Sequence, residues 1–100
     1  MKVYISGKIS GLDEDFVKEK FAKSEKAIKG MGLRYEPINP LNILVIGCAS
    51  PTWQDYMLAD IAELFNCDAI YMQEDWEDSR GAKIEYAIAK EMGLKIYFEK

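Results

Sequence analysis

The chain of 100 residues contains no histidine and only two cysteines, and each scarcity excludes a class of site. Without histidine, neither a Ser-His-Asp nor a Cys-His nucleophile pair can form, and imidazole cannot ligate a metal. Cys48 and Cys67 are too few and too far apart for a disulfide framework or a zinc site. Catalysis by this chain must therefore depend on carboxylates, hydroxyls, thiols, amines or backbone dipoles.

Long apolar segments and basic clusters are missing as well. No apolar run approaches the roughly 18 residues of a membrane helix, and residues 1–8 lack the apolar core of a secretory signal, so we expect a cytoplasmic protein without a membrane partner. The net charge is −4, and the lysines between Lys18 and Lys29 alternate with acidic residues, which predicts a solvated helix face and no nucleic-acid polymer as partner. Small anionic ligands stay open, because backbone amides can hold them.

Hydrophobic periodicity and turn residues predict alternating strands and helices in a single domain, residues 1–100. Strands are expected at 2–6, 33–36, 68–72 and 94–98, with helices from Asp13 to Gly30, from Thr52 to about 64, and from Ser79 to Met92. This order predicts a three-layer α/β fold, flavodoxin- or Rossmann-like, with about four parallel strands in the order 2-1-3-4 and helices on both faces. Ligands of such folds bind beyond the carboxyl ends of the strands, here loops 7–12, 37–50 and 73–79.

The first of these loops, Gly7-Lys8-Ile9-Ser10-Gly11, joins a strand to the start of a helix. It matches neither the Walker pattern nor G-x-G-x-x-G. Exposed amides and the helix dipole at such a position suit a phosphate or carboxylate. The alternative is a tight turn that needs glycine for a positive φ, and the residues alone leave both interpretations open.

Glu85 is predicted at the border of the apolar face of the last helix. That face is defined by Ile84, Ala87, Ile88 and Met92. Small neighbours leave space above the Glu85 carboxylate, and the helix dipole favours its ionised form. The alternative is a boundary glutamate paired with Lys83 or Lys90, and the residues alone favour it.

Asp60 lies on a similar border of the preceding helix, about 60° outside its apolar stripe. Two carboxylates on helices that pack against one sheet could share a cleft, as in glycosyl chemistry, although coincidence is the simpler explanation. Tyr4, Trp53 and Trp76 could stack on a ring or belong to the core. Cys67 is expected to be buried and inert.

Together these segments resemble the nucleoside 2-deoxyribosyltransferase superfamily, including a small phage and bacterial branch of unknown function. The resembling segments are residues 4–11, Asn39-Pro40, Trp53-x-x-Tyr56-Met57-x-x-Asp60-Ile61, residues 67–71 and Trp76-x-x-Ser79-x-Gly81-Ala82-x-x-Glu85. The resemblance implies cleavage of an N-glycosidic bond with Glu85 as the nucleophile, Asp60 as a positioning residue and Tyr4 near the sugar. It also implies a 5′-phosphate held by Ser79 and the first loop. The substrate-binding residues expected on this basis are Gly7, Lys8, Ile9, Ser10, Gly11, Asn39, Trp53, Trp76, Ser79 and Gly81.

We therefore expect hydrolysis of, or deoxyribosyl transfer from, a small-molecule nucleoside or nucleotide, without metal or cofactor. The chain is short for the family and leaves little room for loops that read the base. A nucleotide-binding or sensing module of the same fold without catalysis is the alternative, and a purely structural domain is a third class. Relatives in this family complete their sites with a neighbouring subunit, so a homodimer or higher homo-oligomer is expected.

Overall fold

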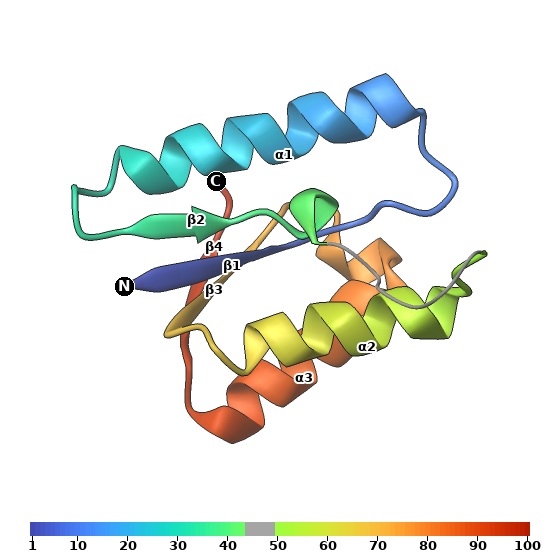
Figure 1. Ribbon diagram of the computed structural model, residues 1–100. Coiled ribbons are helices and arrows are strands. Elements are labelled where there is room, and N and C mark those ends of the chain that lie inside the picture. The colour runs from blue at the N-terminus through green and yellow to red at the C-terminus, as the bar shows by residue number, and fades with distance from the viewer. Residues whose placement is uncertain (44–49) are drawn as a thin grey trace.

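The computed structural model describes residues 1–43 and 50–100, so Cys48 lies outside the described residues. Strands and helices alternate along the chain, with two short 3-10 helices, η1 and η2, in the connections (Figure 1). Their order is β1 (Lys2–Ser6), α1 (Glu14–Lys29), β2 (Glu36–Ile38), η1 (Pro40–Asn42), α2 (Trp53–Leu64), β3 (Ala69–Met72), η2 (Trp76–Asp78), α3 (Arg80–Met92) and β4 (Lys95–Phe98).

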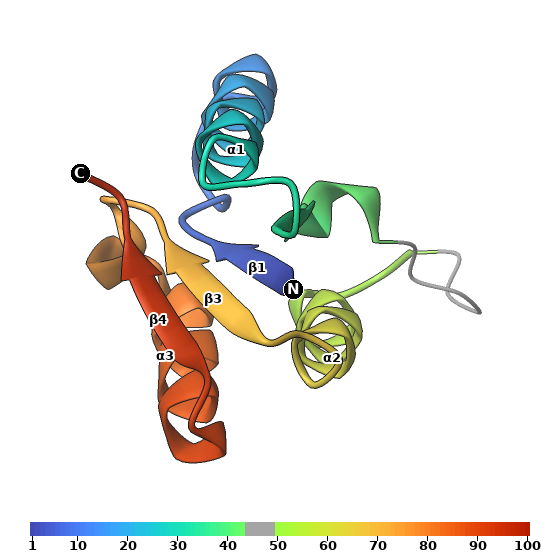
Figure 2. The ribbon, with the colours of Figure 1, turned by 90° about the vertical axis from the view of Figure 1, so that its left-hand side faces the viewer.

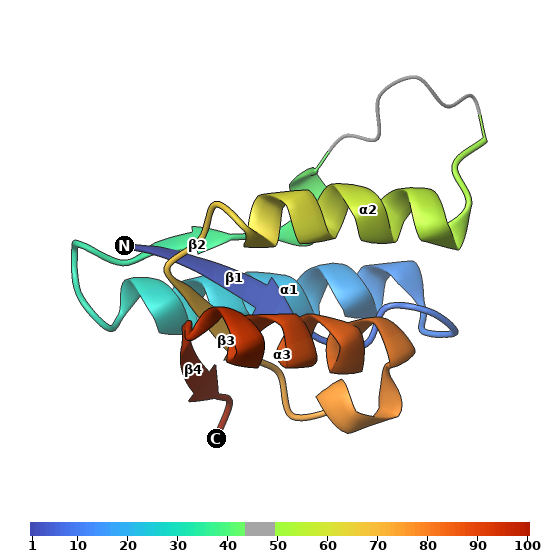
Figure 3. The ribbon, with the colours of Figure 1, turned by 90° about the horizontal axis from the view of Figure 1, so that it is seen from below.

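The four strands form one parallel sheet in the order β2-β1-β3-β4, which confirms the predicted α/β topology. Figure 2 shows α1 on one face of the sheet and α2 with α3 on the other. From below, α2 and α3 lie next to each other with β1 visible between them (Figure 3). Each crossover helix thus covers a sheet face that would otherwise meet water.

Each face of the sheet has its own apolar core, because successive residues of a strand point to opposite sides. The core under α1 contains Val3, Ile5, Val17, Phe21, Ile28, Ala69 and Tyr71. The core under α2 and α3 contains Tyr4, Leu64, Cys67, Ile70, Met72, Ala82 and Ala89. Cys67 is buried there, and burial raises the pKa of its thiol to about 12, so the thiol is protonated and inert.

All three α-helices begin at residues whose side chains cap them. Asp13 caps α1 by accepting from Phe16 N–H, and Ser79 caps α3 by accepting from Ala82 N–H. Thr52 and Asp55 form a reciprocal capping box at the start of α2. The helices have 16, 12 and 13 residues, and in the described part of the chain none is long and apolar enough to cross a bilayer.

The second strand begins three residues later than expected. The sequence predicts it at 33–36, ended by Pro37, but β2 spans Glu36–Ile38 and Pro37 pairs with Val3. A proline is tolerated there because β2 is an edge strand, so the missing N–H can face away from its one neighbour. Leu33, expected inside the strand, is fully exposed.

Candidate active site

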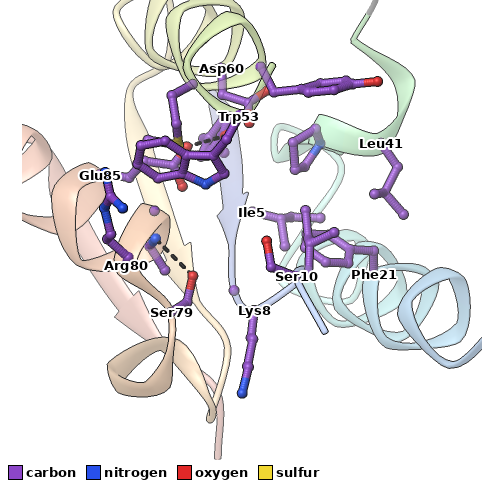
Figure 4. Close-up of a pocket in the computed structure, with 18 of the residues that line it drawn as sticks. Ile5, Lys8, Ser10, Phe21, Leu41, Trp53, Asp60, Ser79, Arg80 and Glu85 are labelled. Atoms are coloured by element: carbon purple, nitrogen blue, oxygen red, sulfur yellow. Dashed lines mark hydrogen bonds between the residues drawn. The ribbon is translucent and has the colours of Figure 1, made fainter. Parts of the chain in front are cut away.

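A cavity of about 750 Å³ opens beside the carboxyl end of β1 (Figure 4). Its described walls come from β1 and the loop after it, from η1 and α2, and from the first turns of α3, with Phe21 of α1 at one side. Carboxyl ends of parallel strands are where folds of this kind bind ligands. The volume falls within the range of about 300–1,000 Å³ that is typical of small-molecule sites.

Glu85 lies on the wall of this cavity and is only 5% exposed. The Tyr4 hydroxyl donates a hydrogen bond of 2.7 Å to Glu85 Oε2, and the Ser6 hydroxyl donates one of 2.7 Å to Oε1. Tyr4 and Ser6 are two positions apart on β1 and therefore point to the same face of the sheet. One strand thus holds both oxygens of the carboxylate.

The position of Glu85 on α3 differs from the sequence prediction. The apolar pattern predicts Glu85 at the border of the packed face, but the buried residues of α3 are Ala82, Glu85 and Ala89, which puts Glu85 at the centre. Ala87 and Met92, expected on the packed face, are exposed. A pattern based on hydrophobicity misses this face because its middle residue is charged and its hydrogen-bond partners come from another element.

The Glu85 carboxyl group is desolvated but well supplied with hydrogen bonds. Burial raises its pKa above the usual value, while the hydrogen bonds from Ser6 and Tyr4 lower it. Burial, and then the charge of Glu85, raises the pKa of Tyr4 well above 10, so Tyr4 keeps its proton and acts as the donor. The ion pairs found between described residues do not include one from Lys83 or Lys90 to Glu85.

Asp60 reaches the same cavity from α2. Burial, and second the negative charge of Glu85, raises the pKa of Asp60 from 3.8 to about 7. Figure 4 shows Asp60 and Glu85 at one end of the cavity, with Lys8 and Ser79 toward the other. An acid with this pKa can give or take a proton near neutral pH, which is the property of a general acid or base.

Four residues of the first loop, Gly7 to Ser10, line the cavity in the described structure, whereas Gly11 does not. Gly11 has a φ of +80°, so its glycine serves the turn. Gly7 has another reason: a Cβ there would overlap the buried side chain of Gln73. Gly7 does not have a positive φ, and because it lines the cavity, anion binding at this residue stays a prediction.

A polar cluster behind the first loop holds it in place. Asp75 accepts a hydrogen bond of 3.2 Å from the backbone N–H of Lys8. The Lys20 ammonium donates to both Asp75 oxygens, at 2.9 and 2.8 Å, and to Gln73 Oε1 at 2.6 Å. Gln73 in turn donates 2.9 Å to the Ser24 hydroxyl. The loop that carries Lys8 is therefore tied to α1 and to the segment after β3.

The start of α3 contributes Ser79, Arg80 and Gly81 to the cavity wall. The Arg80 guanidinium lies 4.1 Å from the ring centroid of Trp53, a cation–π contact between α3 and α2. Gly81 faces Met57, whose sulfur would be 3.0 Å from an added Cβ. Met57 of α2 thus packs on the side of Gly81 where a Cβ would be, and since Gly81 also lines the cavity, contact with a ligand stays a prediction.

Two predicted binding residues, Asn39 and Trp76, are absent from the described lining of the cavity. The Asn39 side chain accepts 2.9 Å from Leu41 N–H and caps η1. Trp76 packs 4.6 Å from the ring centroid of Tyr86 and 6.3 Å from that of Phe98, in an aromatic cluster. Asn39 therefore has a capping role and Trp76 a packing role in the described structure.

The sequence predictions did not include Ser6, Tyr56, Met57 or Arg80 as site residues. Ser6 could have been found from the period-2 pattern of β1, since it shares a face with Tyr4. Tyr56 and Met57 lie one turn before Asp60, within reach of the same cavity wall. In the described residues, no group of three or more His, Cys, Asp or Glu side chains is arranged to hold a metal.

The fold is that of the 2-deoxyribosyltransferases. The chain superposes on 2-deoxyribosyltransferase of Bacillus psychrosaccharolyticus with a TM-score of 0.71 at 14% identity, covering 98% of this chain and 71% of that chain. It superposes on the enzyme of Leishmania mexicana with a TM-score of 0.69 at 18% identity, covering 97% of this chain and 62% of that chain. At these identities the likeness establishes the fold.

The chain belongs to the family described as domain of unknown function (DUF4406), whose model matches residues 1–98. No curated protein matches the sequence.

Proposed function

We propose that the protein cleaves the N-glycosidic bond of a nucleoside or nucleotide, by hydrolysis or by deoxyribosyl transfer. The observation that carries this proposal is Glu85, a buried carboxylate held by two hydroxyls on the wall of a ligand-sized cavity that also contains Asp60. A carboxylate is a competent nucleophile toward an oxocarbenium-like carbon and needs no histidine. The fold shared with two 2-deoxyribosyltransferases supports the same class of reaction.

In the proposed first step, a Glu85 oxygen attacks the anomeric carbon of the sugar while the bond from that carbon to the base nitrogen breaks. The electron pair of that bond leaves with the base, which takes up a proton. Tyr4 and Ser6 hold the carboxylate so that its approach to the sugar needs little reorganisation. The product of this step is a glycosyl ester of Glu85.

Asp60 supplies the proton for the departing base in this proposal. With a pKa of about 7, it holds a proton in a substantial fraction of molecules at neutral pH. Once the base has left, the Asp60 carboxylate takes a proton from water, or from an incoming base, as that group attacks the glycosyl ester. Glu85 is then released as a carboxylate and Asp60 is protonated again.

The cavity suits a substrate with an apolar ring and a polar end. Trp53, Tyr56 and Phe21 give it aromatic walls for a base or sugar, and Trp53 is the stacking residue in this proposal, because Trp76 packs elsewhere. Lys8 and Ser79 lie at the end away from Asp60 (Figure 4), and we assign them to a 5′-phosphate.

The direct test is incubation of the protein with a panel of nucleosides and nucleoside monophosphates, followed by chromatography for released base. Release from at least one substrate is expected, and a second free base in the mixture distinguishes transfer from hydrolysis. If nucleotides bind, as measured by calorimetry, but no base is released from any member of the panel, the catalytic proposal is wrong. The protein is then a nucleotide-binding module.

We further propose that the protein forms at least a homodimer and acts in the cytoplasm. Tyr56 is 50% exposed, and α2 also exposes Leu58 and the adjoining Phe65 at 69% and 59%. Association is one way to cover such apolar area. Sedimentation at micromolar concentration should give a mass above the 11.4 kDa of one chain, and a monomer alone would contradict the assembly.

A further inference from the structure

Ser6 is a buried hydroxyl with one hydrogen-bond acceptor. Its side chain is 1% exposed, and its hydroxyl donates to Glu85 Oε1 at 2.7 Å. Its backbone is fixed by the β1–β3 pairing with Met72 and by the N–H of Gln73, which donates 2.8 Å to the Ser6 carbonyl. The strand therefore presents this hydroxyl to Glu85 in one orientation.

The two carboxyl groups of the cavity differ in their hydrogen bonds. Glu85 accepts from two hydroxyls, whereas no donor among the described residues reaches Asp60. Hydrogen bonds to a carboxylate favour its ionised form, and two like charges in one site disfavour double ionisation. When the site holds one proton, the group without donors is the more favourable place for it.

We propose that Ser6 is a positioning residue that, together with Tyr4, fixes Glu85 as the ionised carboxylate and thereby leaves the shared proton on Asp60. The proposed reaction needs one of the two carboxyl groups ionised, as the nucleophile, and the other protonated, as the acid. Asp60 and Glu85 carry the same functional group, so their surroundings must determine which of them is ionised. The hydrogen bond from the Ser6 hydroxyl to Glu85 favours the ionised form of Glu85 and so assigns the acid role to Asp60. This inference rests on the proposed function for its use in catalysis, but the location of the proton can be measured without any turnover.

Other charged groups around the pair do not replace this role. From β1, Tyr4 faces Glu85 as a neutral donor, and from the segment before β3, Cys67 faces Tyr4 as a neutral thiol. On α3 itself, Arg80 stacks on Trp53. Lys8 and Asp78 also line the cavity. In the described part of the chain neither Lys8 nor Arg80 forms an ion pair with either carboxylate, and Asp78 adds another acid and no cation. The hydroxyls are therefore the groups that distinguish the two acids.

The test is ¹³C NMR titration of the side-chain carboxyl carbons, with Asp60→Asn and Glu85→Gln used to assign the two signals. In the wild type we expect Glu85 to ionise first and Asp60 to stay protonated into the neutral range. In Ser6→Ala, loss of one hydrogen bond should move the first ionisation of the pair up by about one pH unit, with both signals changing in that step. Ser6→Thr keeps the hydroxyl and should restore the wild-type order.

The matched control is Ser24→Ala, which removes a buried hydroxyl of α1 that bonds Gln73 and should leave both titrations unchanged. If Ser6→Ala does not fold, Ser6→Cys, in which a weak thiol donor replaces the hydroxyl, is titrated in its place, and the wild-type titration still tests whether Glu85 ionises first. The inference is overturned if Asp60 ionises before Glu85 in the wild type, or if a folded Ser6→Ala protein titrates like the wild type. If base release is observed, the acidic limb of kcat/KM should move with the first ionisation. A correct titration without base release would overturn the proposed function and leave the proton assignment standing.

Discussion

The two faces of the sheet each carry a partly buried polar cluster, and the two clusters differ in how their charges are combined. Under α1, the Lys20 ammonium is paired with Asp75 at 2.8 Å and bonded to Gln73. Under α2 and α3, two carboxyl groups, Asp60 and Glu85, share a cavity without an ion pair to a cation in the described structure. The cluster under α1 pairs opposite charges, whereas the cluster under α2 and α3 brings two acids together.

This difference indicates which cluster is structural and which is functional. Opposite charges with satisfied hydrogen bonds offset much of the cost of burial, so they can be kept for connecting elements of the fold. Like charges in a partly buried site raise the free energy of the folded state, and groups with such perturbed pKa values concentrate at functional sites. The predictions below act on one cluster or the other, from the largest expected effect to the smallest.

Glu85→Gln should reduce base release by at least about a thousandfold, because it keeps the shape of the side chain and removes the nucleophilic charge. Nucleotide affinity by calorimetry and thermal stability should change little. Glu91→Gln, an exposed position on the same helix, is the matched control and should keep full activity. Wild-type turnover in Glu85→Gln would show that Glu85 is not the nucleophile.

Asp60→Asn should lower kcat by about a hundredfold, the usual contribution of a general acid. At about pH 4, where the folded protein holds Asp60 protonated, the change in the free energy of unfolding should be less than about 1 kcal/mol. Because proton donation needs the acid form, wild-type activity should fall as the pH rises through about 7. Steady-state rates between pH 5 and 9 check both points. A large loss of stability with unchanged specific activity would instead make Asp60 a structural residue.

The same pKa predicts how stability depends on pH. Folding raises the pKa of Asp60 from 3.8 to about 7, so between these values the folded state holds a proton that the unfolded state has lost. The free energy of unfolding should therefore fall as the pH rises from about 4 to about 7. Chemical denaturation at pH 5 and pH 8 should show a smaller difference for Asp60→Asn than for the wild type. Equal differences would mean that Asp60 is not perturbed by folding.

Lys20→Met acts on the paired cluster. It should lower the free energy of unfolding by about 1–3 kcal/mol, because it leaves Gln73 Oε1 without its donor and the Asp75 carboxylate with the Lys8 N–H but no cation. Lys18→Met removes an exposed pair with Glu14 at 3.4 Å and should cost less than about 0.5 kcal/mol. Denaturant titrations compare the two. If Lys20→Met changed the Asp60 and Glu85 titrations, the clusters would not be independent.

A nucleoside 5′-monophosphate should bind about tenfold or more tightly than the parent nucleoside, because charge-assisted hydrogen bonds to phosphate are strong. Lys8→Ala should reduce that advantage, and Lys18→Ala, an exposed lysine on α1, should not. Asp78 also lines the cavity and opposes the effect. Calorimetric titration with one base in both forms measures it, and equal affinities would mean that the first loop is only a turn.

The fold was predictable because its signals are local. Strand and helix periods, the Ser79 cap and the Thr52–Asp55 capping box each depend on residues close in sequence. Their alternation then limits the topology to a parallel sheet. The position of β2 was the exception. Proline usually ends a strand, but Pro37 lies within β2 because β2 is at the edge of the sheet.

The candidate site was predictable in its residue types and less so in its geometry. Glu85 and Asp60 could be named as candidates, but the central position of Glu85 on α3 depends on hydroxyls more than 78 residues away in sequence. Trp76 was placed at the site because an aromatic residue in a loop looks like a stacking surface. Its partners Tyr86 and Phe98 come from elements whose arrangement no local pattern reports.

Gly81 on α3 packs against Met57 on α2, close in sequence to the two acids. Asp60 lies about one helical turn beyond Met57 on α2, and Glu85 lies about one turn beyond Gly81 on α3. A side chain at position 81 would meet the Met57 sulfur at 3.0 Å and push against α2. A glycine at position 81 therefore lets α2 and α3 pack closely at this point, and a larger residue there would push apart the two helices that carry Asp60 and Glu85.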